Sequence, residues 1–174
     1  FLVAGIFEQT DHDIGRGDSK AVAAAKGEAE RLQQIFDALL RIARLDTGRH
    51  RIKGELVQLD ELVVDAVEFY SPEAEARGQD LAASLEACAV IGDRDLLFQA
   101  VTNLLDNAIK FAPKNGSVRA RLNVEGPTAK LRITDTGPGV EEELRAKLPE
   151  RFYRAPGSES IAGTGLGLAL TEAI

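Results

Sequence analysis

The chain has 174 residues, of which 44% are hydrophobic and 28% charged, and its formal net charge is −7. This composition is typical of a globular protein, and the acidic balance argues against a general nucleic-acid binder, which would carry a basic stripe. No apolar run reaches the length of a membrane span, and no signal peptide is visible. The single cysteine, Cys88, lies in an apolar run, which predicts a small buried side chain and is consistent with a reducing compartment.

The two ends of the sequence both look cut. The chain contains no methionine, opens on an apolar run at residues 1–7, and stops inside a helical pattern at Ile174. We therefore expect it to be a piece of a longer protein.

Residues 19–46 are predicted to form one long helix with a wide apolar stripe. The stripe consists of Leu32, Ile35, Phe36, Leu39, Ile42, Ala43 and Leu45. A lone helix cannot bury such a stripe, so it needs partners. Residues 1–10 resemble the end of a first helix, and an antiparallel pair that dimerises into a four-helix bundle would satisfy both. The alternative is a helix that packs only on its own domain.

The remainder of the chain alternates strands with helices. The predicted strands are 56–59, 80–85, 87–91, 117–124 and 129–134, and the predicted helices are 60–76, 94–112 and one from about residue 166. Asp60 is expected to cap the first of these helices. The last two strands alternate apolar and polar residues, so one face of their hairpin should meet solvent. We therefore predict an α+β fold, a two-layer α/β sandwich whose mixed, mostly antiparallel sheet has helices on one face. The predicted domains are 1–48 and 49–174, the second truncated at its C-terminus.

The helix at 94–112 carries a polar stripe opposite its apolar one. At about 100° per residue, one narrow arc holds Asn103, Asp106, Asn107 and Lys110. The opposite arc, expected to face the sheet, holds Leu97, Val101, Leu104, Leu105, Ala108 and Ala112. A solvated face with an Asp106–Lys110 pair explains the spacing alone. Two asparagines argue against it, because Asn is a middling helix former whose amide oxygen suits a hard, hydrated cation such as Mg²⁺.

Two glycine-rich blocks follow. Asp135-Thr136-Gly137-Pro138-Gly139 comes directly after a predicted strand, and Gly163-Thr164-Gly165-Leu166-Gly167 precedes a predicted helix. The second block can present backbone N–H groups to a phosphate. It is neither a Walker A motif nor a dinucleotide fingerprint, because no Lys-Ser/Thr follows and the glycine spacing differs. The small, polar residues between Phe152 and Gly163 predict a mobile loop.

Together these blocks resemble the ATP-binding catalytic domain of sensor histidine kinases. Residues 103–111, 135–139, 151–154 and 163–168 are similar to that family's N, G1, F and G2 boxes, in the same order. The resemblance covers residues 55–174 strongly and residues 19–50 more loosely. It favours the dimerising hairpin over the lone helix.

The resemblance implies a role for each residue of the first helix block. Asn107 would ligate Mg²⁺, and Asn103 would support the metal or its waters. Lys110 would contact phosphate, and Phe111 would pack against the adenine of ATP.

The remaining blocks receive roles in the same way. Asp135 would accept a hydrogen bond from the exocyclic amine of adenine, which suits a buried carboxylate. Phe152 would anchor the ATP lid, and Arg154 (or Arg151) would meet the γ-phosphate. The backbone residues implied in nucleotide binding are Gly137, Gly139, Gly163, Thr164, Gly165, Leu166 and Gly167.

The implied activity is transfer of the γ-phosphoryl group of ATP to a histidine on the dimerisation helix, for relay to an aspartate of a response-regulator receiver domain. The resemblance also implies a homodimer in the cytoplasm, with any membrane anchor upstream. His12 precedes an acid, but no proline follows, and Gly15 and Gly17 should break a helix there. We expect His50 to be a linker residue and the acceptor histidine to lie upstream of Phe1.

Three alternatives share parts of this pattern. ATP-hydrolysing members of the superfamily carry a glutamate four residues before the metal-binding asparagine, where this chain has Asn103, which cannot act as a general base. A scaffold that signals without catalysis would not need the intact boxes. A serine-directed anti-sigma kinase would not need the long helix at 19–46.

Overall fold

The computed structural model describes residues 16–46, 54–158, 161 and 163–174, and it divides the chain into two units, residues 1–37 and 38–174. The helix predicted at 19–46 is confirmed as α2, Arg16–Asp46. It includes Gly17, so the expectation that this glycine breaks a helix is wrong. One glycine near a helix end costs only about 1 kcal/mol, which the rest of a long helix outweighs.

Several earlier expectations fall outside the described residues. These are the first helix at residues 1–10, His12 and His50.

Within α2, the side chains of Leu32, Phe36 and Leu40 are exposed by 59%, 61% and 40%. None of the helices in the described part of the chain combines the length and the hydrophobicity needed to cross a bilayer.

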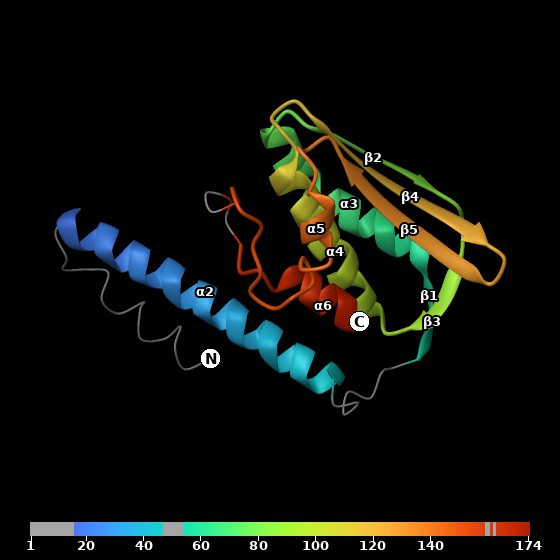
Figure 1. The fold of residues 1–174 in the computed structure, drawn as a ribbon, viewed down its shortest axis with the longest axis horizontal. Helices are drawn as coiled ribbons and strands as arrows, with labels where there is room; N and C mark the ends of the chain where they lie inside the picture. Colours follow the sequence, from blue (N-terminus) through green and yellow to red (C-terminus); the bar gives the residue numbers. More distant parts are fainter. Residues whose placement is uncertain (1–15, 47–53, 159–160, 162) are drawn as a thin grey trace. The chain divides into compact units, whose positions relative to one another are not determined.

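The unit 38–174 contains short strands and helices that form a two-layer sandwich, as predicted (Figure 1). Its elements after α2 are β1 Glu55–Gln58, α3 Leu59–Ala76, β2 Asp80–Leu85, β3 Ala89–Gly92, α4 Arg94–Phe111, β4 Ser117–Glu125, β5 Thr128–Asp135, α5 Glu142–Arg145 and α6 Gly167–Ala173. The strands form two sheets, one pairing β1 with β3 and one in the order β2-β4-β5. In the larger sheet β2 and β4 are parallel, whereas β4 and β5 are antiparallel.

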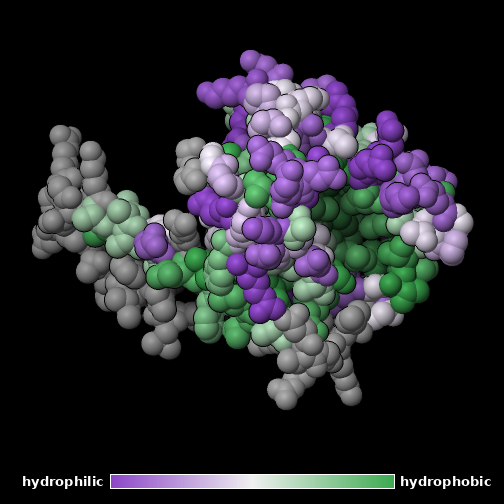
Figure 2. Space-filling model, in the orientation of Figure 1, coloured by the Kyte–Doolittle hydropathy of each residue, from purple (hydrophilic) through white to green (hydrophobic). Residues whose placement is uncertain are grey.

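The helices cover one face of the larger sheet. Along β4, Val118, Ala120 and Leu122 are buried, whereas Arg119 and Arg121 between them are exposed. The buried side chains join a core formed with α3 and α4. Figure 2 shows a hydrophobic hollow between the helical layer and the β4–β5 hairpin, where the inward side chains of β5 are only partly buried.

Two details differ from the sequence-based prediction. Asp60 is not the cap of α3, because Gln58 occupies the N-cap position and Asp60 lies in the first turn. There its carboxylate accepts a hydrogen bond from the backbone N–H of Cys88 at 3.4 Å. The short helix α5 was not predicted, since four residues are too few to show a helical period.

Both ends of α4 are fixed by side chains. At the start, the carboxylate of Asp93 accepts hydrogen bonds from the N–H groups of Asp95 and Leu96 at 3.1 and 3.2 Å. At the end, the buried amide of Gln79 donates to three carbonyl oxygens, those of Ile109, Ala112 and Pro113, at 3.0, 3.0 and 3.2 Å. Carbonyls at a helix end have no partner within the helix. The Ile109 carbonyl also accepts from Arg77 Nη1 and the Pro113 carbonyl from the Gly116 N–H, so among the described residues only the Ala112 carbonyl depends on Gln79 alone.

We expect Gln79→Met to lower the free energy of unfolding by about 2 kcal/mol, because a side chain of similar length would leave the Ala112 carbonyl without a donor and remove one of two donors from the Ile109 and Pro113 carbonyls. The loss is limited because the Oε1 atom of Gln79 is itself buried without a partner in the described part of the chain, and methionine removes it. Urea unfolding measures the change. The same exchange at the exposed Gln58 is the control, and equal effects at the two positions would contradict the assignment.

Candidate functional site

The polar stripe of α4 lies opposite its buried face. Four side chains of the stripe are half-buried: Asn103, Asp106, Asn107 and Lys110. The residues of α4 that point into the core are Leu96, Val101, Thr102, Leu105, Ala108 and Ile109. The helix therefore holds its polar groups at the edge of the core, where they are partly screened from water.

Asn103 joins α4 to the start of α6. Its Nδ2 atom donates to the carbonyl oxygen of Gly167 at 3.1 Å and to the hydroxyl of Thr171 at 3.4 Å. The Thr171 hydroxyl donates in turn to the same Gly167 carbonyl at 2.9 Å. The first asparagine of the stripe thus contacts the second glycine block directly, although the two lie 64 residues apart in the sequence.

The other members of the stripe differ in how they are engaged. Lys110 Nζ lies 2.6 Å from Asp106 Oδ2, so these two form the ion pair that the spacing indicated. The side chain of Asn107 makes no hydrogen bond to any residue that the structure describes. Of the two asparagines, Asn107 therefore has its amide oxygen available for a ligand.

Tyr70 of α3 lies near this ion pair. Burial, followed by the charges of Asp106 and Glu73, raises the pKa of Tyr70 to about 12. Its ring also packs edge-on against Phe69, with the ring centroids 5.2 Å apart. The neutral phenol is therefore favoured beside the polar stripe.

The first glycine block packs against the end of α4. One carboxylate oxygen of Asp135 accepts a hydrogen bond from the Gly137 N–H at 2.7 Å. A Cβ atom at Gly137 would lie 2.7 Å from the Phe111 carbonyl oxygen, so only glycine allows this approach. Asp135 is exposed rather than buried as expected, because it ends the edge strand β5. The Phe111 side chain is 39% exposed.

The second glycine block packs against the segment that begins at Phe152. The Phe152 N–H donates to the Gly165 carbonyl at 2.9 Å. Phe152 and Gly165 both have positive φ angles, 64° and 71°. Leu166, which follows, is 1% exposed, so a buried side chain anchors the block beside α4.

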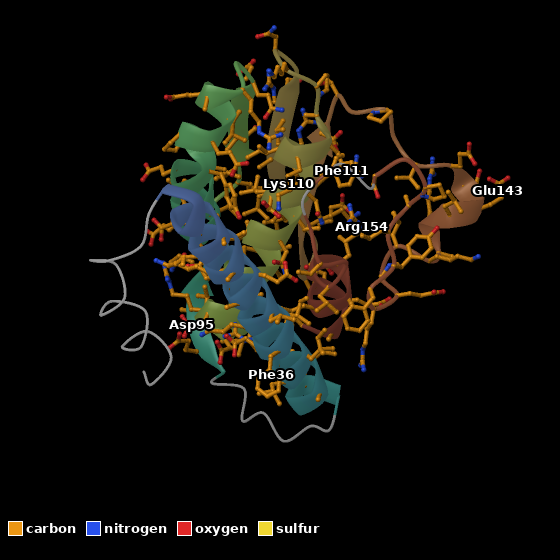
Figure 3. The ribbon with its side chains drawn as sticks, turned by 90° about the vertical axis from the view of Figure 1, so that its left-hand side faces the viewer. Phe36, Asp95, Lys110, Phe111, Glu143 and Arg154 are labelled. Atoms are coloured by element: carbon orange, nitrogen blue, oxygen red, sulfur yellow. The ribbon has the colours of Figure 1, made fainter. Side chains whose placement is uncertain are left out.

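Arg154 is bound to its own segment. Its guanidinium donates to the carbonyl oxygens of Ser158 and, at 2.6 Å, of Ile161. Figure 3 labels Arg154 on this segment and Lys110 and Phe111 at the end of α4. The Nη2 group of Arg154 is therefore bound within the loop and stabilises it.

The remaining backbone residues of the blocks lie in open surroundings. A Cβ atom at Gly139 or Gly163 would meet no atom of the described residues within 4 Å, apart from those of its neighbours in the chain. Gly163 is exposed and Thr164 half-buried. These positions leave room for a ligand to approach the backbone.

Two residues of this site were missed in the sequence. Gln99 Nε2 donates to Asn103 Oδ1 at 3.1 Å, and the Thr171 hydroxyl accepts from the same asparagine. Gln99 lies one helical turn before Asn103, and this spacing is a known signal for a side-chain hydrogen bond. No local signal points to Thr171, because it meets Asn103 only through the packing of α6 on α4.

We expect Gly165→Ala to destabilise the unit 38–174 by about 2 kcal/mol or more. Its φ of 71° disfavours any side chain, and a Cβ atom would lie 2.8 Å from the backbone of Phe152. Thermal unfolding and amide exchange of residues 152–166 measure the effect. Gly163→Ala is the matched control and should change stability by less than about 0.5 kcal/mol. Equal effects of the two exchanges would contradict the packing described.

We expect Tyr70 to titrate with a midpoint near pH 12. The variant Tyr153→Phe leaves Tyr70 as the single tyrosine, so near-ultraviolet absorbance reports on it alone. Because the pKa is raised above the unfolded value of about 10, its contribution to stability is present below about pH 10 and is lost as the pH rises through about 12. Asp106→Asn should lower the midpoint only partly, since burial is the larger cause. A midpoint near 10 would contradict the environment of Tyr70.

Comparison with known proteins agrees with the arrangement of these blocks. Residues 92–174 match the family described as histidine kinase-, DNA gyrase B-, and HSP90-like ATPase. The signal transduction histidine-protein kinase BaeS of Escherichia coli (strain K12) is 31% identical over 97% of this chain, which spans 37% of that protein. The chain therefore covers only about a third of this curated relative.

Solved structures give the same result. The mycobacterial sensor histidine kinase MprB is 36% identical, with a TM-score of 0.60 over 68% of this chain and 76% of that one. Full-length ShkA, determined in complex with AMPPNP, is 25% identical, with a TM-score of 0.80 over 94% of this chain and 34% of that one. With the α/β sandwich and the four joined blocks, these matches show that the chain belongs to the sensor histidine kinases.

Proposed function

We propose that this chain is the kinase core of a two-component sensor, which binds Mg-ATP and transfers its γ-phosphoryl group to a histidine on the dimerisation helix. One observation carries the proposal: three contacts join four blocks that are separate in the sequence. The Asn103 amide donates to the Gly167 carbonyl, the backbone carbonyl of Phe111 lies close to Gly137, and the Phe152 N–H donates to the Gly165 carbonyl. The complex of ShkA with AMPPNP, a relative with the same fold, supports the choice of ATP.

The donor set at the polar stripe fits Mg²⁺. Amide oxygens are suitable ligands for a cation that keeps most of its waters, and the amide of Asn107 is uncommitted among the described residues. We assign Asn107 as the direct ligand and Asn103 as a support for the metal or its waters. Bound Mg²⁺ would neutralise charge on the β- and γ-phosphates during transfer.

Lys110 is the proposed phosphate contact. Its ion pair with Asp106 is 23% and 30% exposed at the two side chains, so it is partly accessible to solvent. An i,i+4 pair of this kind contributes only a few tenths of a kcal/mol to a helix. Exchanging the carboxylate for a phosphate oxygen therefore costs little, and the ammonium group stays positioned until ATP arrives.

Asp135 and Phe111 are proposed to hold the adenine. One oxygen of the Asp135 carboxylate is fixed by the Gly137 N–H, and this bond orients the other. A carboxylate only accepts hydrogen bonds, so it suits the amine of adenine and repels the carbonyl oxygen of guanine. The exposed ring of Phe111 offers a stacking surface, and such a stack contributes about 1–3 kcal/mol.

The segment from Phe152 to Gly167 is the proposed lid. Phe152 and Gly165 fix its base through their hydrogen bond, while the backbone of Gly139, Gly163 and Thr164 has space around it for phosphate. For Arg154 to reach the γ-phosphate, it must release the carbonyls of Ser158 and Ile161. We propose that this exchange accompanies closure of the lid over ATP.

Transfer is favoured over hydrolysis because no carboxylate stands at position 103. The Asn103 amide cannot accept a proton from water at neutral pH. We further propose a homodimer formed through the exposed apolar side chains of α2, a response-regulator receiver domain as the partner, and a cytoplasmic location. Leu32, Phe36 and Leu40, which recur at every fourth residue, support the dimer, since the described part of the chain leaves their apolar surfaces exposed.

We expect Asn107→Asp to weaken binding of Mg-AMPPNP at least about tenfold, because a carboxylate beside the phosphates adds repulsion and alters the metal ligand. Asp135→Ala should weaken it by about 10- to 100-fold and reduce the preference over the guanine analogue. Calorimetry measures both. Asn123→Asp, on the exposed face of β4, is the control for added charge. Wild-type affinity in both site variants would refute the proposed function.

A further inference from the structure

A series of hydrogen bonds between side chains leads into the candidate site from α2. Arg41 Nη1 donates to Gln99 Oε1 at 3.4 Å, and Gln99 Nε2 donates to Asn103 Oδ1 at 3.1 Å. Asn103 Nδ2 donates onward to the carbonyl oxygen of Gly167 at 3.1 Å. All four residues belong to the unit 38–174. None of the roles proposed above uses Gln99 or Arg41.

The donor-to-acceptor direction of these hydrogen bonds is fixed at both ends of the series. An arginine side chain only donates hydrogen bonds, so Gln99 must turn its oxygen toward Arg41 and its NH₂ group toward Asn103. A backbone carbonyl only accepts, so Asn103 must turn its NH₂ group toward Gly167. The two requirements agree, and they leave one orientation of the Asn103 amide in which every hydrogen bond is made.

We propose that Gln99 is a positioning residue. It fixes the orientation of the Asn103 amide, and through this amide it fixes the position of α6 and its glycine block on α4. The inference rests on the proposed function, in which Asn103 supports the metal or its waters. With its NH₂ group bound to α6, the asparagine keeps its oxygen on the side of Gln99. That oxygen has two lone pairs, so one remains for a metal-bound water while the other accepts from Gln99.

The shortness of α6 explains why its position depends on the contact with Asn103. The helix has seven residues and no side-chain cap at its start. Asn103 and Thr171 together satisfy the Gly167 carbonyl and place the glycine block against α4. If the Asn103 amide rotated by half a turn, two carbonyl oxygens would face each other and the block would lose its register.

We expect Gln99→Met, which keeps the length of the side chain and adds no charge, to speed amide exchange in α6 about fivefold in the absence of nucleotide. Affinity for Mg-AMPPNP should fall by a similar factor, while the unfolding midpoint stays within error of the unaltered chain. Gln99→Glu should speed exchange at least as much, because it presents an acceptor to the Asn103 oxygen. Gln58→Glu controls for the added charge.

A double-mutant cycle separates positioning from independent contributions. Gln99 and Thr171 share no hydrogen bond, but both act on Asn103. The effects of Gln99→Met and Thr171→Val on exchange in α6 should therefore be smaller together than the sum of the two alone.

The possible results distinguish the positioning role of Gln99 from the proposed function. If the effects of Gln99→Met and Thr171→Val on amide exchange are additive, or if exchange in α6 is unchanged, the role of Gln99 is overturned even if nucleotide binds normally. Failure of the unaltered chain to bind Mg-AMPPNP would refute the proposed function, while the exchange measurements would still decide whether Gln99 seats α6. A fall in affinity that only follows a fall in the unfolding midpoint would identify a purely structural role and overturn the inference.

Discussion

A single hydrogen bond, from the Asn103 amide to the Gly167 carbonyl, brings the polar stripe of α4 against the glycine block before α6. Its net contribution to stability is only about 1 kcal/mol. Burial of Leu166 and Leu170 contributes about 1.5–3 kcal/mol each, so apolar packing holds α6 in place. The amide sets the register instead: it selects which carbonyl of the block meets which side chain of the stripe. The proposed phosphate contacts of the Gly163 and Thr164 backbone depend on that choice.

The polar stripe can hold the glycine block in register because both ends of α4 are fixed by residues outside the helix. Asp93 caps its start, and Gln79 satisfies the carbonyls at its end, where Phe111 and Lys110 lie. Fixed ends make small movements of the site expensive, because buried carbonyls would lose their partners. The groups that must exchange partners when ligand binds are of another kind. The Asp106–Lys110 pair and the Arg154 contacts are partly solvated and can be replaced at low cost.

Much of the fold follows from patterns within single elements. The helix at 94–112 and the strands at 80–85, 117–124 and 129–134 match α4, β2, β4 and β5 closely, because their apolar periodicity extends over many residues. The misses are short or depend on distant partners. The four residues of α5 show no period. The expected cap role of Asp60 is wrong because its carboxylate accepts from the backbone of Cys88, which lies on another segment. The separation into two sheets is likewise a matter of pairing between strands, which no single strand encodes.

For the site, the sequence by itself determined the residue types and their order: two asparagines on one arc, a carboxylate after a strand, and glycines where backbone must approach closely. These requirements are local, since they follow from helical spacing and from the size of a side chain. Only the tertiary structure decided the partners. It directs Asn103 to α6, leaves the amide of Asn107 uncommitted among the described residues, exposes Asp135 at a sheet edge and turns Arg154 onto its own loop. The physical reason is that a hydrogen bond depends on which groups the packing of distant elements brings within about 3 Å, and spacing along one helix carries no record of that.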